Sequence, residues 1–360
     1  GQTMVNMATG EGGSGRQAGS SFKTFTLAAA IEEGIDPETK IDAGRQEKFP
    51  GWDVHNIGYA DYGTRSIASA FAVSSNTAFA RLCLSLGPDK VADMAHKLGI
   101  TSPLEEVGSI TLGTSLVTPL EMADAYATLA NGGVHYDPEC IERVVDRNGK
   151  VIVDNSNPQG ERVIDQEVAV ATIEVMKGVV TSGTGRAAAL WSLGQEAGGK
   201  TGTADDYKDN WFCGITPQLS VAIWLGDRAD ITKAKSIPGG VSAASVFSDF
   251  LGKALKGQQT EKFPKADKKP DYIKDFRDEE YHIGGNYGKG DDDAEKQGEA
   301  AQTGEAPDTP PTTTTPPATQ PTTPPATDPG NTGGNQGGNQ GGNQGGNQGG
   351  NQGGNTGGNP

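Results

Sequence analysis

Residues 19–24 read Gly19-Ser20-Ser21-Phe22-Lys23-Thr24 and open a run of small and apolar residues that ends at Gly34. The three-residue spacing of Ser20 and Lys23 predicts that both side chains lie on one face of a helix, one turn apart. At that spacing a lysine amine can reach a serine hydroxyl. A serine hydroxyl is a weak nucleophile without a base beside it, and a desolvated lysine with a lowered pKa can be that base. The partial positive charge of a helix N-terminus favours the same chemistry.

The same Ser-x-x-Lys pattern also has a purely structural interpretation. Many helices begin with a capping serine and carry an exposed lysine one turn later. The four residues alone therefore do not decide between a capped helix and a catalytic site. The decision depends on partners elsewhere in the chain.

The overall charge and the cysteines argue against two kinds of site. The formal net charge of -16 disfavours a nucleic-acid partner, because neutralising phosphates requires clustered Lys and Arg. Cys83, Cys140 and Cys213 form no CxxC pair and have no histidine pair nearby, so we expect no metal site and no cofactor. One disulfide with one free thiol is compatible with the sequence.

The beginning of the chain predicts a fragment of a longer protein. Residues 1–9 start without an initiator methionine and resemble a strand from the middle of a domain. No apolar run is long enough to span a bilayer, and no signal peptide opens the chain. The alternative to a fragment is a cytosolic protein, which the first residues disfavour.

Apolar periodicity and breaker residues predict the order of elements along the domain. Residues 35–62, rich in Gly, Pro and Asp without a clear period, are expected to form a long structured loop. The polar sequence Ser74-Ser75-Asn76 separates two helical runs. A threonine, a proline and a glycine pair delimit a helix over 118–133. The remaining predictions are helices over 88–99, 168–180 and 243–255, a hairpin around Asn148-Gly149, and antiparallel strands over 198–204, 210–215 and 219–226.

Composition divides the chain into three parts. We expect a globular domain over residues 1–257, a charged linker over 258–300 and a disordered tail over 301–360. The tail contains a Pro/Thr tract followed by Gly-Gly-Asn-Gln repeats, which cannot bury enough apolar surface to offset the entropy of ordering. A solubilising spacer is the simplest role for such a tail, and contact with a partner or a porous matrix is the alternative.

Three short motifs follow one another along the chain. They are Ser20-x-x-Lys23, Ser74-x-Asn76 and Lys200-Thr201-Gly202-Thr203. Their predicted settings are a helix start, a turn between helices and a strand. In this combination the chain resembles the penicillin-binding protein and serine β-lactamase superfamily. The resemblance implies an α+β fold, in which helices flank an antiparallel sheet and an all-helical subdomain adjoins it.

A closer resemblance is to the bifunctional class A penicillin-binding proteins. Residues 16–23 resemble their nucleophile region, although that family usually has proline at the positions of Ala18 and Thr24. Residues 123–133 and 199–219 are similar to further stretches of their transpeptidase domains. The resemblance implies a transpeptidase domain that begins after its first strands. It also implies that a membrane anchor and a glycosyltransferase domain precede it.

The resemblance assigns the catalytic steps to three residues. Ser20 would attack the carbonyl of the penultimate D-Ala of a peptidoglycan stem peptide and form an acyl-enzyme. Lys23 would accept the hydroxyl proton, and Ser74 would relay a proton to the leaving amine. Positive charge at Lys200 would help to lower the pKa of Lys23. The backbone N–H groups of Ser20 and Thr203 would form the oxyanion hole.

The same resemblance assigns substrate binding to five residues. Asn76 would hydrogen-bond the peptide backbone of the substrate, and Lys200 would raise the local positive potential. The hydroxyls of Thr201 and Thr203 would hold the terminal carboxylate, while Gly202 would let the strand approach without obstruction. The expected partners are therefore stem peptides ending in D-Ala-D-Ala, β-lactam antibiotics and other proteins of cell-wall synthesis, on the extracytoplasmic face of a bacterial membrane.

Two alternatives to a D,D-transpeptidase stay open at this point. A D,D-carboxypeptidase or β-lactamase would pass the acyl group to water. However, Glu105, Glu106 and Glu121 do not form the Glu-x-x-x-Asn pattern that places such a water in class A β-lactamases. The other alternative is a non-catalytic sensor that binds β-lactams on the same fold. Trp52 is expected to face the substrate, whereas the four histidines are interpreted as structural or surface residues.

Overall fold

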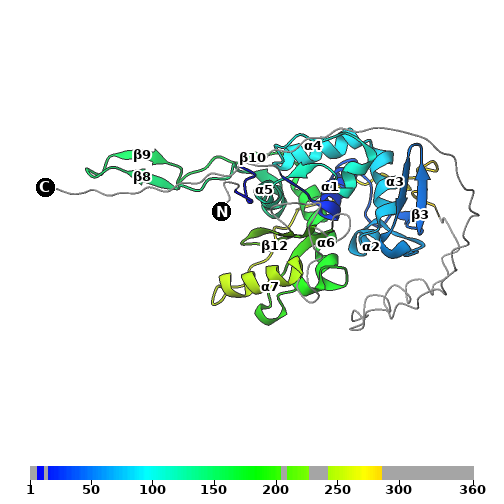
Figure 1. Ribbon diagram of the computed structural model, residues 1–360. Helices are drawn as coiled ribbons and strands as arrows, with labels where there is room; N and C mark the ends of the chain where they lie inside the picture. Colours follow the sequence, from blue (N-terminus) through cyan, green and yellow to red (C-terminus); the bar gives the residue numbers. More distant parts are fainter. Residues whose placement is uncertain (1–5, 12–14, 204–208, 227–241, 286–360) are drawn as a thin grey trace, which may run out of the picture. The chain divides into compact units, whose positions relative to one another are not determined.

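The computed structural model describes residues 6–11, 15–203, 209–226 and 242–285 (Figure 1). Helices and antiparallel strands are combined in this part of the chain, which confirms the predicted α+β class. None of the helices formed by the described residues has the length and apolar character needed to cross a membrane. The predicted tail, 301–360, lies outside the described residues.

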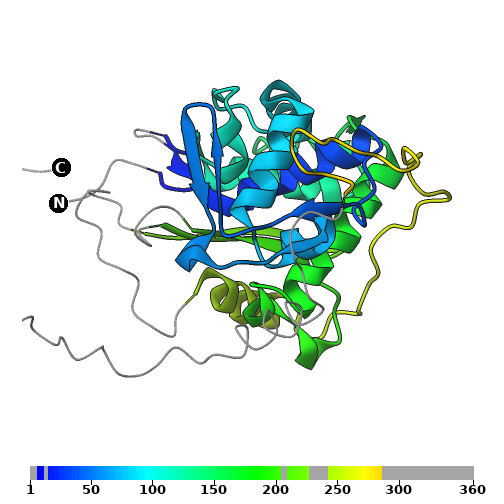
Figure 2. The same cartoon turned by 90° about the vertical axis from the view of Figure 1, so that its right-hand side faces the viewer.

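A three-stranded antiparallel sheet separates two layers of helices. Its strands are β11 (Gly198–Thr203), β12 (Asp209–Ile215) and β13 (Ser220–Gly226), in that spatial order, as the sequence predicts. Side chains of β12 alternate between the two faces. Trp211 enters the main core, whereas Phe212 packs against Phe247 of α7 (Ala243–Ala254). Helices therefore cover both faces, and α7 packs on the side of Phe212 (Figure 2).

The helix that carries Lys23 is buried on all sides. Every residue of α1 (Lys23–Glu32) is buried except the last, Glu32. A helix that is apolar around its whole circumference belongs in a core, and its small residues let neighbours approach closely. Three helices pack around it: α3 (Asn76–Leu86), α4 (Pro88–Leu98) and α6 (Gln166–Thr181). Packing thus fixes the position of the lysine backbone.

Two of the other helices begin at capping side chains. In α5 (Pro119–Ala130), Thr118 and Glu121 form a capping box, and proline is the first helical residue. The shorter α2 (Ile67–Ala72) is capped by the Ser66 hydroxyl, which accepts from the Ser69 N–H group. The helices predicted over 88–99, 118–133, 168–180 and 243–255 are all confirmed.

Short elements join these layers. The 3-10 helices are η1 (Gly19–Phe22), η2 (Ile57–Tyr59), η3 (Gly108–Leu112), η4 (Arg186–Ala188) and η5 (Trp191–Leu193). Paired strands are β1 (Arg16–Gln17) with β6 (Leu116–Val117), and β7 (Val134–His135) with β10 (Glu161–Arg162). The predicted hairpin around Asn148-Gly149 is confirmed as β8 (Arg143–Val145) paired with β9 (Val151–Asp154), and its strand residues are all exposed.

The prediction of a loop over 35–62 is wrong for much of that segment. Strand β2 (Lys40–Asp42) pairs with β5 (Thr64–Ser66), and β3 (Gln46–Phe49) pairs with β4 (Trp52–His55). The polar residues of β3 and β4 conceal the strand period. The turn signal is Pro50-Gly51, because Gly51 has the positive φ, 74°, that a Pro-Gly turn requires.

The first residues and the cysteines can be compared with the predicted first strand and the possible disulfide. Residues 1–5 of the predicted first strand lie outside the described residues. The following residues form a turn instead, in which the Gly10 N–H group donates to Asn6 O at 2.8 Å. Cys83, Cys140 and Cys213 form no disulfide, so all three are free thiols.

The described part of the predicted linker packs against the domain. Phe263 and Ile283 are buried in the main core, and the Gly284 N–H group donates to Lys40 O at 2.7 Å. The predicted boundary at 257 is therefore too early, because packing continues into the segment up to residue 285. Apolar residues that stand singly among many charged ones show no period, so nothing in the local sequence indicates this packing.

Replacing Ile283 by alanine tests this anchoring. The side chain is fully buried, so Ile283→Ala should lower the free energy of unfolding by about 2–4 kcal/mol. Ile273 lies in the same segment but is 51% exposed, so Ile273→Ala should change it by less than about 0.5 kcal/mol. Urea unfolding of both variants measures the difference. Equal, small effects would show that the segment is a solvated linker.

Candidate active site

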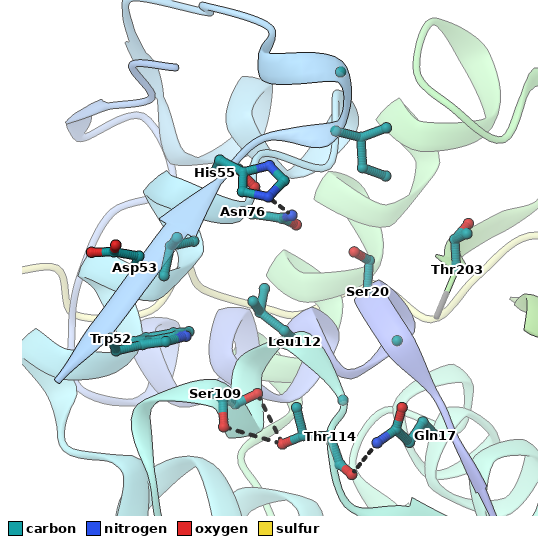
Figure 3. A pocket seen from close by; sticks show the side chains of 15 residues that line it. Gln17, Ser20, Trp52, Asp53, His55, Asn76, Ser109, Leu112, Thr114 and Thr203 are labelled. Carbon is teal, nitrogen blue, oxygen red and sulfur yellow. Dashed lines mark hydrogen bonds between the residues drawn. The ribbon is translucent and has the colours of Figure 1, made fainter. Parts of the chain in front are cut away.

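Ser20 lies in η1, the 3-10 turn that leads directly into α1. The α-helix itself begins at Lys23, so the serine precedes the first α-helical turn. Ser20 is 8% exposed and borders a cavity (Figure 3). The preceding Gly19 has a φ of 58°, and a Cβ there would lie 2.7 Å from the backbone oxygen of Thr203. Glycine is therefore required for β11 to lie against the serine turn.

The amine of Lys23 is held by the turn between α2 and α3. Its Nζ donates to the backbone oxygen of Ser74 at 2.7 Å and to Asn76 Oδ1 at 2.8 Å, and it lies 3.4 Å from Ser74 Oγ. Among the residues that the structure describes, no hydrogen bond joins Lys23 Nζ to Ser20 Oγ. The contact expected from their spacing is therefore not formed, and the amine instead lies among acceptors from another element.

Ser74 adopts a backbone conformation that is rare for residues other than glycine. Its φ is 61°, and holding such a residue in this region costs about 1–3 kcal/mol. In this conformation the Ser74 carbonyl and hydroxyl both contact buried lysine amines. The neighbouring Ser75 is the N-cap of α3, and its hydroxyl accepts from the Ala78 N–H group at 3.2 Å. Ser75 thus caps the helix, while Ser74 contacts the lysines of the site.

Lys200 approaches the same hydroxyl from β11. Its Nζ donates to Ser74 Oγ at 2.7 Å and to the backbone oxygen of Thr201 at 3.2 Å. Ser74 Oγ therefore lies between two lysine amines, both of which belong to fully buried residues. Three motifs that are far apart in the sequence meet at this one oxygen.

Burial sets the protonation of both lysines. Removal from water disfavours the charged ammonium group, so burial lowers the pKa of Lys23 well below the ordinary lysine value, and the charge of Lys200 lowers it further. Burial also lowers the pKa of Lys200 to about 7. A neutral amine at Lys23 has a free lone pair near neutral pH, which is what a general base requires.

Strand β11 brings the last motif to the site. Thr201 Oγ1 shares a hydrogen bond of 2.7 Å with Thr184 Oγ1, and Thr203 borders the same cavity as Ser20. Gly202 lies between them, where a Cβ would be only 2.2 Å from the backbone oxygen of Ala18. Glycine at this position is a packing requirement, as the sequence predicts.

The cavity in front of Ser20 has a volume of about 800 Å³ (Figure 3). Asn76 and Thr203 lie on two sides of it, and Trp52 and His55 of β4 form part of its wall. Trp52 therefore faces the site as predicted. His55, interpreted as a structural or surface residue, also lines the cavity, and its backbone oxygen accepts from Asn76 Nδ2 at 2.9 Å.

A second cavity adjoins the same serine. Its volume is about 320 Å³, and its lining includes Ser20, Ser74, Thr201 and Thr203. Ser20 is thus accessible from both cavities. An extended ligand could place its reacting carbonyl at Ser20 with one end in each cavity.

The structure brings all eight residues predicted from the sequence motifs to one place. Besides His55, the residues that contact them and were missed include Thr184 and Asn56. Neither belongs to a recognisable motif, and Asn56 lies in the segment interpreted as a loop. Such residues are recognised only by the hydrogen bonds they make to other segments in the folded protein. The sequence therefore carries no signal for them.

Comparison with known proteins identifies the family. Residues 13–251 match the family model for the penicillin-binding protein transpeptidase domain. The chain therefore belongs to this family.

Individual relatives agree with this assignment. Penicillin-binding protein 1A of Mycobacterium tuberculosis is 35% identical over 279 residues, which cover 70% of this chain and 34% of that protein. Penicillin-binding protein 1A of Rickettsia typhi is 32% identical over 286 residues, covering 72% of this chain and 36% of that protein. The chain thus spans about a third of the length of these curated relatives.

Solved structures support the same fold. The penicillin-binding protein PonA1 from Mycobacterium tuberculosis superimposes with a TM-score of 0.67 at 32% identity, covering 76% of this chain and 77% of that one. The structure of the same protein in complex with penicillin V gives a TM-score of 0.65 at 32% identity, covering 74% and 76%. The penicillin-binding protein fold predicted from the motifs is confirmed.

The buried lysines should make stability depend on pH. A lysine with a pKa of about 7 in the folded protein and an ordinary pKa in the unfolded chain binds more protons when unfolded at pH values between the two. Stability therefore rises with pH across this window, by at most about 1.4 kcal/mol per pH unit for each such lysine. Lys200→Met removes the Lys200 contribution.

The free energy of unfolding of Lys200→Met minus that of the wild type should consequently decrease as the pH rises from about 7 to about 10. Chemical unfolding at several pH values measures this difference. Lys253→Met, at an exposed lysine of α7, is the control for the loss of a lysine side chain. A pH-independent difference for Lys200→Met would contradict the lowered pKa.

Proposed function

We propose that this domain is a serine-type D,D-transpeptidase that forms an acyl-enzyme at Ser20. The observation that carries the proposal is the contact of two buried lysine amines with the Ser74 hydroxyl, beside a serine that borders a cavity. The lowered pKa of Lys23 supplies a base at neutral pH. Membership of the transpeptidase family and the likeness to PonA1, which has been solved with penicillin V, support the same function.

In the first step, Ser20 Oγ attacks the carbonyl carbon of the penultimate D-Ala of a stem peptide. Neutral Lys23 takes the hydroxyl proton as the bond forms, a contact that enzymes often tighten only once substrate is bound. The carbonyl oxygen becomes an oxyanion, which the backbone N–H groups of Ser20 and Thr203 stabilise. Each such donor is worth about 3–4 kcal/mol in comparable enzymes.

In the second step, the tetrahedral intermediate collapses and the peptide C–N bond breaks. The leaving D-Ala amine needs a proton, and Ser74 Oγ provides it. Because Lys23 Nζ and Lys200 Nζ both lie within hydrogen-bonding distance of that oxygen, the proton lost from Ser74 is replaced from a lysine. The products are free D-Ala and an ester between the peptide and Ser20.

Three groups would bind the substrate around the reacting carbonyl. Asn76 Nδ2 gives one hydrogen to His55 O and keeps a second for the peptide backbone of the substrate. The hydroxyls of Thr201 and Thr203 would hold the terminal carboxylate, and Lys200 adds positive charge behind them. The absence of a side chain at Gly202 lets this strand lie close to the nucleophile turn.

Release of the acyl group to an amine is favoured over release to water. Both carboxylate oxygens of Glu121 accept hydrogen bonds from Thr101, Ser102 and Thr118, so this glutamate is committed to the structure. Glu105 and Glu106 are exposed. None of these three glutamates is therefore arranged like the glutamate that activates a water in class A β-lactamases. This supports a transpeptidase over a β-lactamase.

The biological setting follows from the same proposal. The substrates would be peptidoglycan stem peptides ending in D-Ala-D-Ala, with β-lactam antibiotics as covalent inhibitors and other cell-wall synthesis proteins as partners. Such substrates are found outside the bacterial cytoplasmic membrane, so the domain would act on that face. The relatives named penicillin-binding protein 1A support a place within a bifunctional class A protein.

Labelling with penicillin V tests the nucleophile. The wild-type protein should gain the mass of one penicillin V molecule and keep it for hours, whereas Ser20→Ala should gain none. Ser21→Ala is the matched control, because Ser21 is the next residue but its hydroxyl donates to the backbone oxygen of Ala18. Intact-mass spectrometry measures all three proteins. A mass gain that persists in Ser20→Ala would overturn the assignment, and rapid loss of the label would indicate a β-lactamase.

The product formed from a synthetic stem peptide separates transfer from hydrolysis. With an amine-bearing acceptor peptide present, we expect D-Ala release together with a cross-linked dimer, and Ser20→Ala should form neither. Mass spectrometry of the peptides measures both products. Free, shortened peptide as the sole product would indicate a D,D-carboxypeptidase, and a labelled protein that releases no D-Ala would indicate a sensor.

A further inference from the structure

The turn that holds Lys23 requires outside support. Ser74 has a φ of 61°, which costs a serine about 1–3 kcal/mol and persists only where surrounding contacts over-determine it. On its N-terminal side, the Ser74 and Ser75 N–H groups bond to Phe71 O and Ala70 O at 3.0 and 2.9 Å. These contacts end α2, but they do not hold the residues that follow Ser74, which must be fixed by other groups.

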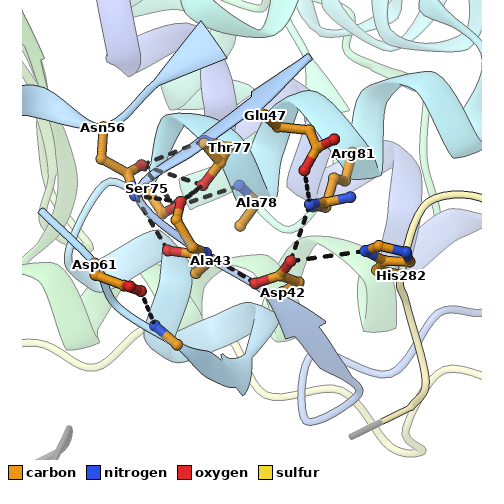
Figure 4. A network of polar contacts seen from close by, with 12 residues as sticks. Asp42, Ala43, Glu47, Asn56, Asp61, Ser75, Thr77, Ala78, Arg81 and His282 are labelled. Atoms are coloured by element: carbon orange, nitrogen blue, oxygen red, sulfur yellow. Dashed lines mark hydrogen bonds and ion pairs between the residues drawn. The ribbon is translucent and has the colours of Figure 1, made fainter. Parts of the chain in front are cut away.

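The side chain of Asn56 provides that support from the end of β4. Its Oδ1 accepts from Ser75 Oγ at 3.0 Å and from the Thr77 N–H group at 3.3 Å (Figure 4). It also accepts from the Asn76 N–H group at 2.8 Å. Thr77 Oγ1 lies 3.4 Å away. One amide oxygen thus binds three successive residues that follow Ser74.

The other end of the same amide is anchored in a different segment. Asn56 Nδ2 donates to the backbone oxygens of Ala43, Gly44 and Ala60 at 3.1, 3.0 and 2.9 Å. Asn56 is 1% exposed, so water does not compete for these bonds. Only a side chain with both two donors and an acceptor can join these two sets of partners.

The residue before Asn56 completes the connection to the amine. His55 O accepts from Asn76 Nδ2 at 2.9 Å, which leaves Asn76 Oδ1 to accept from Lys23 Nζ at 2.8 Å. Two consecutive residues of one segment therefore hold Asn76, one through its backbone and one through its side chain. Two of the hydrogen bonds made by Lys23 depend on this arrangement, namely those to Asn76 Oδ1 and Ser74 O.

We propose that Asn56 is a positioning residue for acylation, which holds the turn of residues 74–76 so that its acceptors keep Lys23 Nζ in place. This inference rests on the proposed acyl-enzyme at Ser20. Asn56 touches neither the reacting atoms nor the substrate, and it acts through Ser75, Asn76 and Thr77. Without its donors, the Asn56 side chain is no longer anchored to the backbone of residues 43, 44 and 60. The turn that its oxygen binds then relaxes towards an unstrained φ, which moves Ser74 O and Asn76 Oδ1 away from the amine.

The variant Asn56→Asp tests the proposal with almost no change in volume. It keeps an acceptor for the turn but places a carboxylate oxygen against three carbonyl oxygens. The first-order rate constant of acylation by penicillin V should fall by about 10- to 100-fold at neutral pH, because small displacements of catalytic groups have effects of this size. The dissociation constant of the complex before acylation should change less than about threefold, since Asn56 does not contact the ligand.

The pH dependence distinguishes positioning from a general loss of structure. Protonation gives the introduced carboxyl group one donor back, so the wild-type to Asn56→Asp ratio of acylation rate constants should shrink as the pH is lowered. Thr128→Val is the control for lost stability, because Thr128 is buried and its hydroxyl donates to Leu98 O in the helical layer. Thr128→Val should acylate at the wild-type rate.

The outcomes separate this inference from the proposed function. A wild-type protein that is not acylated at Ser20 would overturn the proposed function and, with it, the inference. A folded Asn56→Asp protein that acylates at the wild-type rate would overturn the inference alone. If Asn56→Asp does not fold, Thr77→Val decides, because it removes only a hydroxyl that donates to Gly44 O at 2.8 Å and contacts Asn56. A decrease of about 3- to 10-fold would then support the inference, and an unchanged rate would overturn it.

Discussion

The site depends on keeping two lysine amines out of water beside one hydroxyl. A buried ammonium group loses its hydration, so each amine favours its neutral form unless nearby acceptors compensate. The fold supplies those acceptors from a single turn, which gives Ser74 O and Asn76 Oδ1 to Lys23 and Ser74 Oγ to Lys200. The complete burial of Lys23 at the start of α1 serves this arrangement, because a helix free to move would admit water to the amine.

Two glycines determine how closely the sheet approaches the nucleophile. A Cβ at Gly19 would lie 2.7 Å from the backbone oxygen of Thr203, and a Cβ at Gly202 would lie 2.2 Å from that of Ala18. The turn and strand β11 are therefore in backbone contact. From this position on the strand, Lys200 reaches the Ser74 hydroxyl.

The β3–β4 hairpin connects the wall of the cavity to the catalytic turn. Trp52 and His55 line the cavity, and Asn56 follows directly with its amide between two buried segments (Figure 4). Because a fully hydrogen-bonded buried network is rigid, the shape of the cavity and the position of Lys23 share one support. A change that shifts this hairpin would therefore alter ligand binding and proton transfer together.

The sequence by itself determined the helices, the cap of α5 and the three-stranded sheet, because caps and periodicity act between residues that are close in the chain. The eight residues that meet at the site were predicted from the resemblance of three separate motifs to the penicillin-binding proteins. Only the tertiary structure decided that Lys23 bonds to the turn at Ser74 rather than to Ser20, since spacing sets the direction of a long side chain but not its acceptors. The same holds for the β3–β4 hairpin, for Asn56 and for the buried Ile283. Their partners lie far away in sequence, and a polar or isolated apolar residue carries no local sign of them.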